Sequence, residues 1–241
     1  NKAQKVSISK DHEDLGISQD LQQDVTANNV INIALFGVDA DDGKTGRSDS
    51  IMIMTIDKNN NVIKLTSLMR DSYVDIAGQG ADKLCHAYAY GGPELAIKTI
   101  NQNFNLNISD FASVNFTTMP EIIDAIGGVE ITVKDYEVWE LPGIDSPGTY
   151  TLSGDKALAY SRIRHSGNGD YERTDRQRAV LEQVFNKISS AGALKFSGYV
   201  SKLLPLVETS LSNTQIIKLG TELLSQGSLS LEQKRFPEDE Y

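Results

Sequence analysis

The chain has 241 residues and a formal net charge of -10, with 33 acidic side chains against 23 lysines and arginines. This acidic balance argues against a nucleic-acid partner, because there is no basic stripe to displace counterions from a phosphate backbone. The sequence contains no run of eighteen apolar residues that could span a membrane. The only cysteine, Cys85, excludes an internal disulfide bond.

Residues 1–29 are polar with few large apolar side chains, so we expect them to form a tether or a loosely docked arm. The chain begins with Asn1 rather than Met, and we expect that an upstream membrane anchor has been removed. The remaining residues, 30–241, are predicted to form one domain.

Strands and helices are predicted to alternate through this domain. Apolar runs predict strands at Val30–Val38, Ile51–Ile56, Val62–Leu68, Phe111–Phe116 and Val129–Val133. Apolar spacing with proline, serine and glycine boundaries predicts helices that begin near Pro93, Pro120 and Ser153, and longer ones at Tyr171–Ser190, Leu194–Leu204 and Thr214–Leu224. The alternation predicts the α/β class, with a single layered α/β/α domain around a mixed central β-sheet.

Arginine is concentrated in this acidic chain. Seven of the eight arginines lie in three short segments, at Arg47, at Arg70 and in the cluster Arg162, Arg164, Arg173, Arg176 and Arg178. Arginine binds carboxylate or phosphate through paired hydrogen bonds, whereas the lysines are scattered along the sequence. We therefore predict a local cationic pocket for a phosphate or pyrophosphate.

Two aspartates accompany Arg47. Asp39 ends the first predicted strand and Asp49 precedes the second, so neighbouring strands would bring both carboxylates to one edge of the sheet. One or two carboxylates together with substrate phosphate form a usual site for Mg²⁺. An isolated loop aspartate more often caps a turn, but the flanking glycines and Arg47 favour the metal site.

Arg70 and Asp71 follow the third predicted strand, and ligands gather at strand ends in open α/β sheets. Their side chains would point to opposite faces if the strand continued. A surface ion pair is the alternative interpretation.

The densest group begins at Tyr160. Arg162 and Arg164 would share one face of an extended segment, with Ile163 packed the other way. Arg173 and Gln177 lie one helical turn apart at the edge of the apolar stripe of the next helix, so they should face inward.

The other two arginines of this group are placed differently. Arg176 falls on the far side of the helix, and Arg178 flanks its stripe. A structural ion-pair network with Asp170, Glu172 and Asp175 is the alternative interpretation. The five arginines of the cluster outnumber these three acids, which favours a bound anion.

Two aromatic residues, Tyr136 and Trp139, follow the strand Val129–Val133. They are interpreted as core residues in preference to a sugar-binding platform.

Taken in order, short motifs in this chain resemble the LytR-CpsA-Psr family of cell-wall glycopolymer transferases. The matching stretches are Phe36–Asp39, Arg47–Met52, Ser67–Asp71, Lys83–Gly92, Ile126–Glu130, Leu152–Gly154, Tyr160–Arg164 and Arg173–Gln177. Met69 stands where the family usually has proline, and Cys85-His86 where it usually has an Asn or small-residue pair. Neither departure removes a charged group.

The resemblance implies an extracytoplasmic domain of a Gram-positive cell envelope, held at the cell membrane by an N-terminal anchor. Such proteins resemble phosphotransferases that move a glycopolymer from a polyprenyl-pyrophosphate carrier onto peptidoglycan. The polymer would be a teichoic acid, a capsule or another wall polysaccharide. The similarity also implies a hydrophobic tunnel for the prenyl chain.

On this interpretation Asp39 and Asp49 hold the metal, Mg²⁺ or Mn²⁺. The pyrophosphate is bound by Arg47, Arg70, Lys83, Arg162, Arg164, Arg173 and Gln177, since phosphoryl transfer needs mainly positioning and charge neutralisation. Catalytic roles are expected for Arg70, Asp71, Arg162 and Arg164, and the general base stays open between Asp71 and Asp175. A protein that only binds polyprenyl pyrophosphate, or a hydrolase that releases the polymer to water, would use the same residues.

Overall fold

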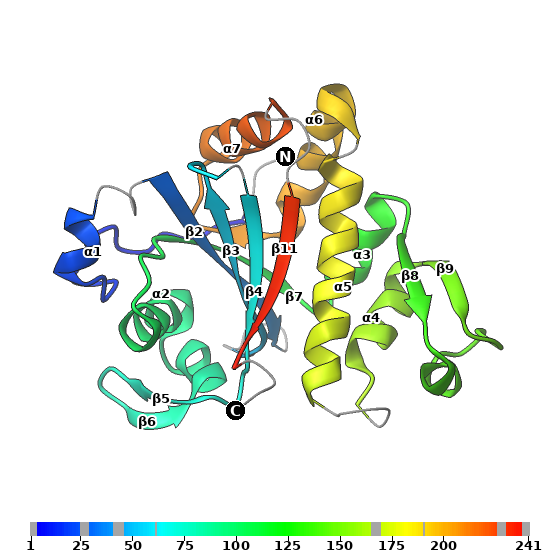
Figure 1. Cartoon of the computed structure of the whole chain (residues 1–241), viewed down its shortest axis with the longest axis horizontal. Coiled ribbons are helices and arrows are strands. Elements are labelled where there is room, and N and C mark those ends of the chain that lie inside the picture. Colours follow the sequence, from blue (N-terminus) through cyan, green and yellow to red (C-terminus); the bar gives the residue numbers. More distant parts are fainter. Residues whose placement is uncertain are drawn as a thin grey trace.

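The computed structural model describes residues 4–24, 29–40, 46–60, 62–164, 170–189, 191–225 and 230–237. Its centre is a seven-stranded mixed sheet in the order β1–β10–β7–β2–β3–β4–β11 (Figure 1). The strands are β1 (Gln4–Lys5), β2 (Val30–Asp39), β3 (Arg47–Asp57), β4 (Val62–Leu68), β7 (Asp110–Asn115), β10 (Glu208–Thr209) and β11 (Ser230–Phe236). β2, β3 and β4 form an antiparallel meander, while β7 pairs parallel with β2 and β11 pairs parallel with β4.

Helices cover both faces of this sheet, which confirms the predicted α/β class. One face carries α1 (Gln19–Gln23), α2 (Leu84–Phe104) and the hairpin of β5 (Tyr73–Ile76) and β6 (Gly80–Lys83) (Figure 1). The other carries α3 (Met119–Ala125), α4 (Gly154–Arg162), α5 (Asp170–Ser189), α6 (Gly192–Leu203) and the short 3₁₀ turn η3 (Leu204–Leu206), with α7 (Asn213–Ser225) at the top in Figure 1. Within the described residues, none of these helices is long and apolar enough to cross a membrane.

A small lobe packs on the outer side of α5. It consists of β8 (Val129–Val133), the 3₁₀ helix η2 (Asp135–Glu140) and β9 (Gly148–Leu152). The alternating pattern of β8 buries Val129, Ile131 and Val133 against α4 and α5, and leaves the intervening side chains exposed. Helix α5 therefore lies between the sheet and the lobe.

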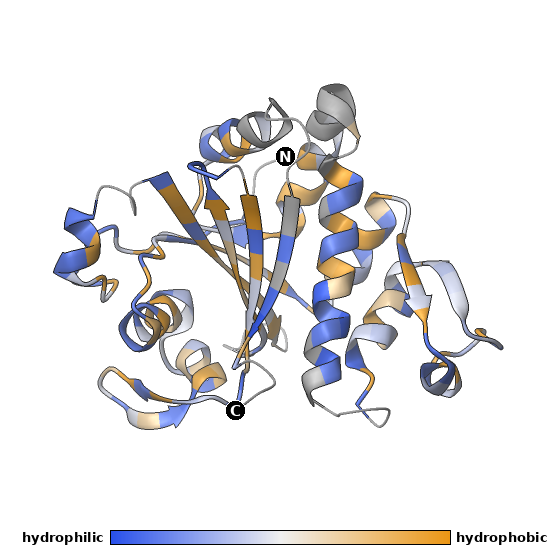
Figure 2. Cartoon of the chain, in the orientation of Figure 1, coloured by the Kyte–Doolittle hydropathy of each residue, from blue (hydrophilic) through white to orange (hydrophobic). Residues whose placement is uncertain are grey.

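Within the described part of the chain, buried apolar side chains form two clusters. The first joins the α2 face of the sheet to α2, for example Phe36 and Ile51 with Ile97 and Ile100. The second lies under the β8–β9 lobe. Figure 2 shows hydrophobic colour along the central strands and striped colour along α5, as expected for buried strands and an amphipathic helix.

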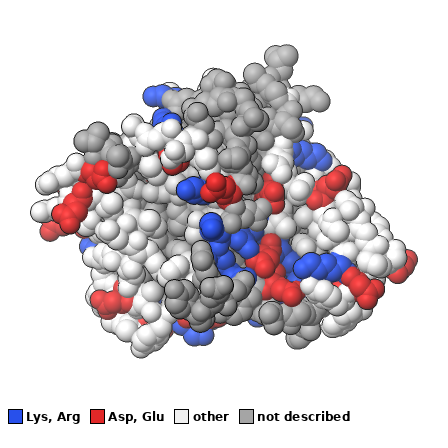
Figure 3. All heavy atoms as spheres, viewed as in Figure 1, with Lys and Arg blue, Asp and Glu red and all other residues white. Residues whose placement is uncertain are grey.

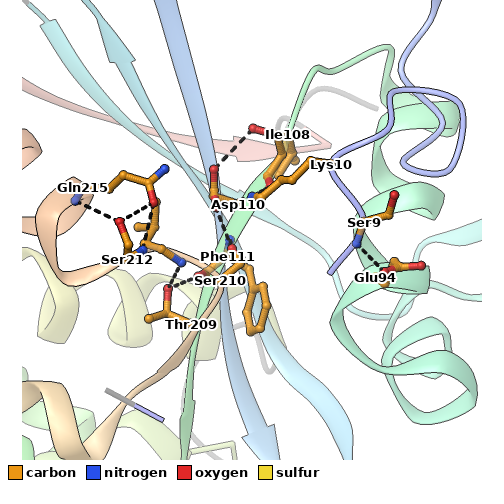
Figure 4. A network of polar contacts seen from close by, with 12 residues as sticks. Ser9, Lys10, Glu94, Ile108, Asp110, Phe111, Thr209, Ser210, Ser212 and Gln215 are labelled. Carbon is orange, nitrogen blue, oxygen red and sulfur yellow. Dashed lines mark hydrogen bonds and ion pairs between the residues drawn. The ribbon is translucent and has the colours of Figure 1, made fainter. Parts of the chain in front are cut away.

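The described part of the N-terminal arm is packed against the domain. Leu15 is fully buried, and Ile17 is buried beside it in the first cluster. Lys10 Nζ contacts Asp110 at 2.6 Å, and the amide of Ser9 donates to Glu94 at 2.7 Å (Figure 4). β1 also pairs with β10, so the segment adds a strand to the sheet edge.

The structure differs from the predicted elements at several places, including the strands β1, β5, β6, β9 and β10, which were not predicted. β3 begins at Arg47 rather than at Ile51, because polar residues continue the pairing with β2. α2 begins at Leu84 and continues across a break at Gly91 and Gly92, so the segment before Pro93 is also helical. Strand β11 was not predicted, since a polar strand at the edge of a sheet has only a weak apolar signal.

The prediction that Tyr136 and Trp139 are core residues is wrong. Tyr136 is 38% exposed and Trp139 is 67% exposed. Both lie on η2, where Glu137 points inward in their place.

Candidate functional site

A pocket of about 260 Å³ opens at the edge of the sheet where β3 begins. Its lining residues come from β3, the end of β7, the end of α4 and the first turns of α5, namely Asp49, Phe116, Arg162, Arg164, Arg173 and Gln177. Three arginines and one carboxylate thus converge from segments that lie far apart in the sequence. Of the six, only Phe116 was not predicted as a site residue.

A β-bulge places Asp49 on the pocket wall. Gly37 pairs with Ser50 and Val38 pairs with Ser48, so Asp49 has no partner residue on β2. Such a bulge redirects the extra side chain. A Cβ on Gly37 would lie 2.9 Å from the Cβ of Ser50, so this close approach of the two strands requires glycine.

The end of α4 positions the next two arginines. Arg162 is the last residue of α4, and Ile163 turns the chain with its side chain buried. Arg162 and Arg164 therefore line the same pocket while Ile163 packs the other way, as predicted, although the segment is a helix end and not a strand. The guanidinium of Arg162 lies 5.1 Å from the centre of the Phe116 ring, a favourable cation–π distance.

Arg173 and Gln177 face inward from α5, which confirms their predicted placement. Arg173 is 3% exposed and Gln177 is 6% exposed. An inward-facing guanidinium needs an anion or several hydrogen-bond acceptors. The pocket of Asp49, Arg162 and Arg164 is the space into which these two side chains open.

Arg176 lies on the side of α5 away from the apolar stripe, as predicted, and that side is buried. Arg176 is 2% exposed, because the β8–β9 lobe covers that side of the helix. Its Nε donates to Glu137 at 2.7 Å, and one terminal nitrogen donates to Glu172 at 2.8 Å. The structural ion-pair alternative is therefore correct for this arginine.

Arg178 also forms a structural ion pair. It contacts Asp175, which is in addition bound by Arg235 of β11 at 3.3 Å. In Figure 3 basic and acidic side chains alternate across the region where β11 and α5 lie in Figure 1. Asp175 thus carries two guanidinium partners and is poorly suited to act as a general base.

Arg70 connects the pocket to a second charged group. Arg70 donates a hydrogen bond to the carboxylate of Asp49, and its Nε lies 3.5 Å from one carboxylate oxygen of Asp71. The other carboxylate oxygen of Asp71 accepts a hydrogen bond from Lys83 Nζ at 2.9 Å. Partial burial raises the pKa of Asp71, but the hydrogen bond from Lys83 and the charge of Arg70 outweigh this effect and hold the pKa below its ordinary value. The pKa of Lys83 is raised, chiefly by its hydrogen bond to Asp71.

Two other predicted residues are outside the pocket lining. Arg47 is exposed at the start of β3, where its backbone pairs with Asp39, two residues before Asp49. Lys83 reaches the site through Asp71 and Arg70. The side chain of Asp39, the other expected metal ligand, lies outside the part of the chain that the structure describes.

The described residues could supply one carboxylate ligand of a divalent-metal site, Asp49. They contain no group of three or more acidic, histidine or cysteine side chains that could hold an ion. Mg²⁺ does not require such a group, because it commonly binds one or two carboxylates, water and substrate phosphate. Asp49 offers one carboxylate on the wall of a pocket that is otherwise suited to phosphate.

A second cavity, also of about 260 Å³, lies behind the first, between the sheet and the helices of the α5 face. Its walls are almost entirely apolar and include Leu35, Val114, Ile122, Val180, Leu181, Val184 and Ile188. Gln177 lines both cavities. A ligand with an anionic head and a long apolar tail would match this arrangement.

Comparison with known proteins agrees with this geometry. The LytR_cpsA_psr family model matches residues 1–241. A relative from Enterococcus faecalis, named polyisoprenyl-teichoic acid–peptidoglycan teichoic acid transferase TagU, is 38% identical over 194 residues. The alignment covers 78% of this chain and 63% of that relative, so the chain spans less than two thirds of its length.

Two solved structures are similar over most of the chain. TagT bound to LIIa-WTA has a TM-score of 0.73 and 30% identity, with 86% of this chain and 78% of that chain covered. TagT bound to LI-WTA has a TM-score of 0.77 and 28% identity, with coverages of 95% and 86%. The family match over the whole sequence and these shared folds show that the chain belongs to the LytR-CpsA-Psr family.

Proposed function

We propose that this protein transfers a glycopolymer from a polyprenyl-pyrophosphate carrier to peptidoglycan. The observation that carries the proposal is the junction of the arginine pocket with the apolar cavity at Gln177. A diphosphate would occupy the pocket beside Arg162, Arg164 and Arg173, and the prenyl chain would occupy the cavity. A polyprenyl diphosphate has both features, a compact dianion and a long hydrocarbon chain.

The names of the relatives support the substrate class. The Enterococcus relative is named a transferase of polyisoprenyl-linked teichoic acid to peptidoglycan, and two of the similar TagT structures are described as bound to LIIa-WTA and LI-WTA. We therefore favour a teichoic acid over a capsule or another wall polysaccharide as the transferred polymer. The partners are then the lipid-linked glycan and peptidoglycan, and the place of action is the outer face of the cell membrane. An N-terminal membrane anchor and a Gram-positive source stay predictions.

In the proposed reaction a hydroxyl oxygen of a peptidoglycan sugar attacks the phosphorus that carries the glycopolymer. The bond from that phosphorus to the bridging oxygen breaks, and polyprenyl phosphate leaves. The hydroxyl proton passes to a base or to solvent. Arg162, Arg164 and Arg173 stabilise the charge that develops on the phosphoryl oxygens, and Arg70 supports them through Asp49.

Mg²⁺ or Mn²⁺ is part of this proposal, with Asp49 as one ligand and Asp39 as the other. A bound divalent ion supplies charge neutralisation and orients the diphosphate. Arg47, at the start of β3, and Lys83, beside Asp71, would add long-range positive charge at the entrance. Asp71 is a weak candidate for the base, because two cations lower its pKa.

The test is incubation of the protein with a lipid-pyrophosphate-linked oligosaccharide and peptidoglycan fragments, with products resolved by mass spectrometry. A covalent oligosaccharide–peptidoglycan conjugate, formed with release of polyprenyl phosphate, is the expected product. Free oligosaccharide phosphate without conjugate would identify a hydrolase. Unchanged lipid that co-purifies with the protein would identify a binding protein, and either of these results would overturn the transferase proposal.

A further inference from the structure

Two neighbouring aromatic side chains on the β8–β9 lobe are not used by the proposed chemistry. Tyr136 and Trp139, here called the aromatic ridge, both lie on η2 and are 38% and 67% exposed. Side chains three residues apart in a 3₁₀ helix project in the same direction. The two rings therefore project from the same side of η2, where Lys134 Nζ lies over the Tyr136 ring, 5.5 Å from its centre.

The ridge is held rigidly on its inner side. Glu137, between the two aromatic residues, is 1% exposed and forms an ion pair with Arg176 at 2.7 Å. Glu137 also accepts the backbone amide of Lys134 at 2.8 Å, and the hydroxyl of Tyr136 donates to Glu172 at 3.0 Å. A preorganised surface loses little conformational entropy when a ligand binds.

The same buried arginine connects the ridge to the phosphate pocket. Arg176 donates to the backbone oxygen of Ile163 at 3.1 Å, and Ile163 lies between the pocket residues Arg162 and Arg164. Glu172, the partner of Tyr136, directly precedes the pocket residue Arg173. The ridge and the pocket are thus attached to the same turn of α5 and the same end of α4.

The charge around the ridge limits the choice of ligand. The flanking side chains Glu130, Asp135 and Glu140 are acidic, with Lys134 as the one base between them. These carboxylates disfavour a polyphosphate polymer and an anionic lipid surface. The adjacent outer face of β8 and β9 carries hydroxyl groups, such as Thr132 and Thr149, which lie 2.9 Å apart.

From these observations we propose that the aromatic ridge binds the uncharged acetamido-sugar backbone of the acceptor glycan by stacking on Tyr136 and Trp139. The proposal rests on the proposed function, because it assigns the acceptor side of the same reaction. Sugar rings present apolar C–H faces, and acetamido groups add a methyl group. Large, rigid aromatic side chains that have a polar group at one end suit such ligands.

Trp139 is the only tryptophan in the sequence, so its fluorescence reports directly on the ridge. Titration of the intact protein with a β-1,4-linked N-acetylglucosamine tetrasaccharide should give a saturable blue shift, because the sugar displaces water from the exposed indole. Tyr136→Ala should weaken this binding about tenfold. The matched control is Tyr73→Ala, which removes an exposed tyrosine on β5, away from the ridge, and should leave the titration unchanged.

Transfer kinetics provide the second measurement. Trp139→Ala should raise the KM for the peptidoglycan acceptor about tenfold, with kcat and the binding of the lipid donor nearly unchanged. Trp139→Phe, which keeps a ring for stacking, should recover most of the loss. A blue shift with vesicles of anionic phospholipid but none with the tetrasaccharide would identify a membrane contact and overturn the proposal.

The two proposals fail in different ways. If the tetrasaccharide binds and no conjugate ever forms, the transferase function is wrong and the sugar-binding ridge stands. If the conjugate forms with the same acceptor KM in wild type and in Trp139→Ala, the ridge proposal is wrong and the transferase function stands.

Discussion

Arg70 donates a hydrogen bond to Asp49, joining the second residue after the end of β4 to the bulged position of β3. The ion pair keeps the carboxylate of Asp49 on the pocket wall, opposite Arg162 and Arg164. One carboxylate therefore contacts a cation on one side and faces a phosphate-sized space on the other. This arrangement would let the same residue position an arginine and bind a metal ion.

Asp49→Asn should make activity low and insensitive to divalent metal, because a hard cation loses its anionic ligand. Activity of wild type and variant is compared in Mg²⁺ and in chelator, and binding of Mn²⁺ in the presence of pyrophosphate is measured by calorimetry. Asp75→Asn, an exposed carboxylate on β5, is the control. Equal activity of the wild type in Mg²⁺ and in chelator would show that the metal assignment is wrong.

Substitution of two classes of arginine should separate function from stability. Arg162→Ala or Arg164→Ala should abolish transfer with the melting temperature held or slightly raised, because removal of one pocket cation reduces repulsion within the pocket. Arg176→Ala should instead lower the free energy of unfolding by about 3–5 kcal/mol, because it leaves Glu137 buried and unpaired. Thermal unfolding and the transfer assay on the same preparations test both statements. Retained activity with a falling melting temperature in Arg162→Ala would assign that arginine to the structural network.

The sequence predicts most of this site because the relevant signals are local. Helical periodicity places Arg173 and Gln177 on one inward face, and Ile163 turns inward whether its segment is a strand or a helix end. The same periodicity places Arg176 on the opposite side of the helix, but it does not predict that this side is buried. The burial depends on the lobe that covers the outer side of α5, and such a packing relationship between distant segments leaves no periodic pattern.

Long-range contacts also explain the other differences. Tyr136 and Trp139 are aromatic and follow a buried strand, so the sequence suggests that they are core residues. In the structure the buried residue of this segment is Glu137, which forms an ion pair with Arg176. Strand β11 is polar and forms only through its register with β4. The apolar cavity is made by side chains of several separate elements, each of which individually resembles an ordinary core position.

The partly exposed group of Asp82, His86 and Tyr90 predicts a pH-dependent contribution to stability. The hydrogen bond from Tyr90, followed by that with His86, lowers the pKa of Asp82 to about 2. Because the folded-state pKa lies below the ordinary aspartate value of 3.8, the stabilisation is present above about pH 4 and is lost as the pH falls towards 2. Asp82→Asn should thus lower the melting temperature at pH 6, and the difference from wild type should shrink between pH 4 and pH 2. A difference that stays constant over this range would contradict the assignment.

The apolar cavity should bind the lipid through hydrocarbon area, separately from the charge-based binding of the diphosphate. Each buried methylene-sized group contributes on the order of 0.8 kcal/mol, so shorter prenyl chains should bind progressively more weakly with little dependence on salt. Val184→Phe places a ring into the space beside Val180 and Leu181 and should weaken binding of long chains only. Its control, Ile217→Phe on the exposed side of α7, should leave the binding of every chain length unaffected.

Arg164→Ala should weaken binding equally at all chain lengths and reduce its salt sensitivity, because it removes a charge and no apolar contact. Binding of long and short chains with equal affinity by the wild type would mean that the protein recognises only the diphosphate head and that the cavity has another purpose.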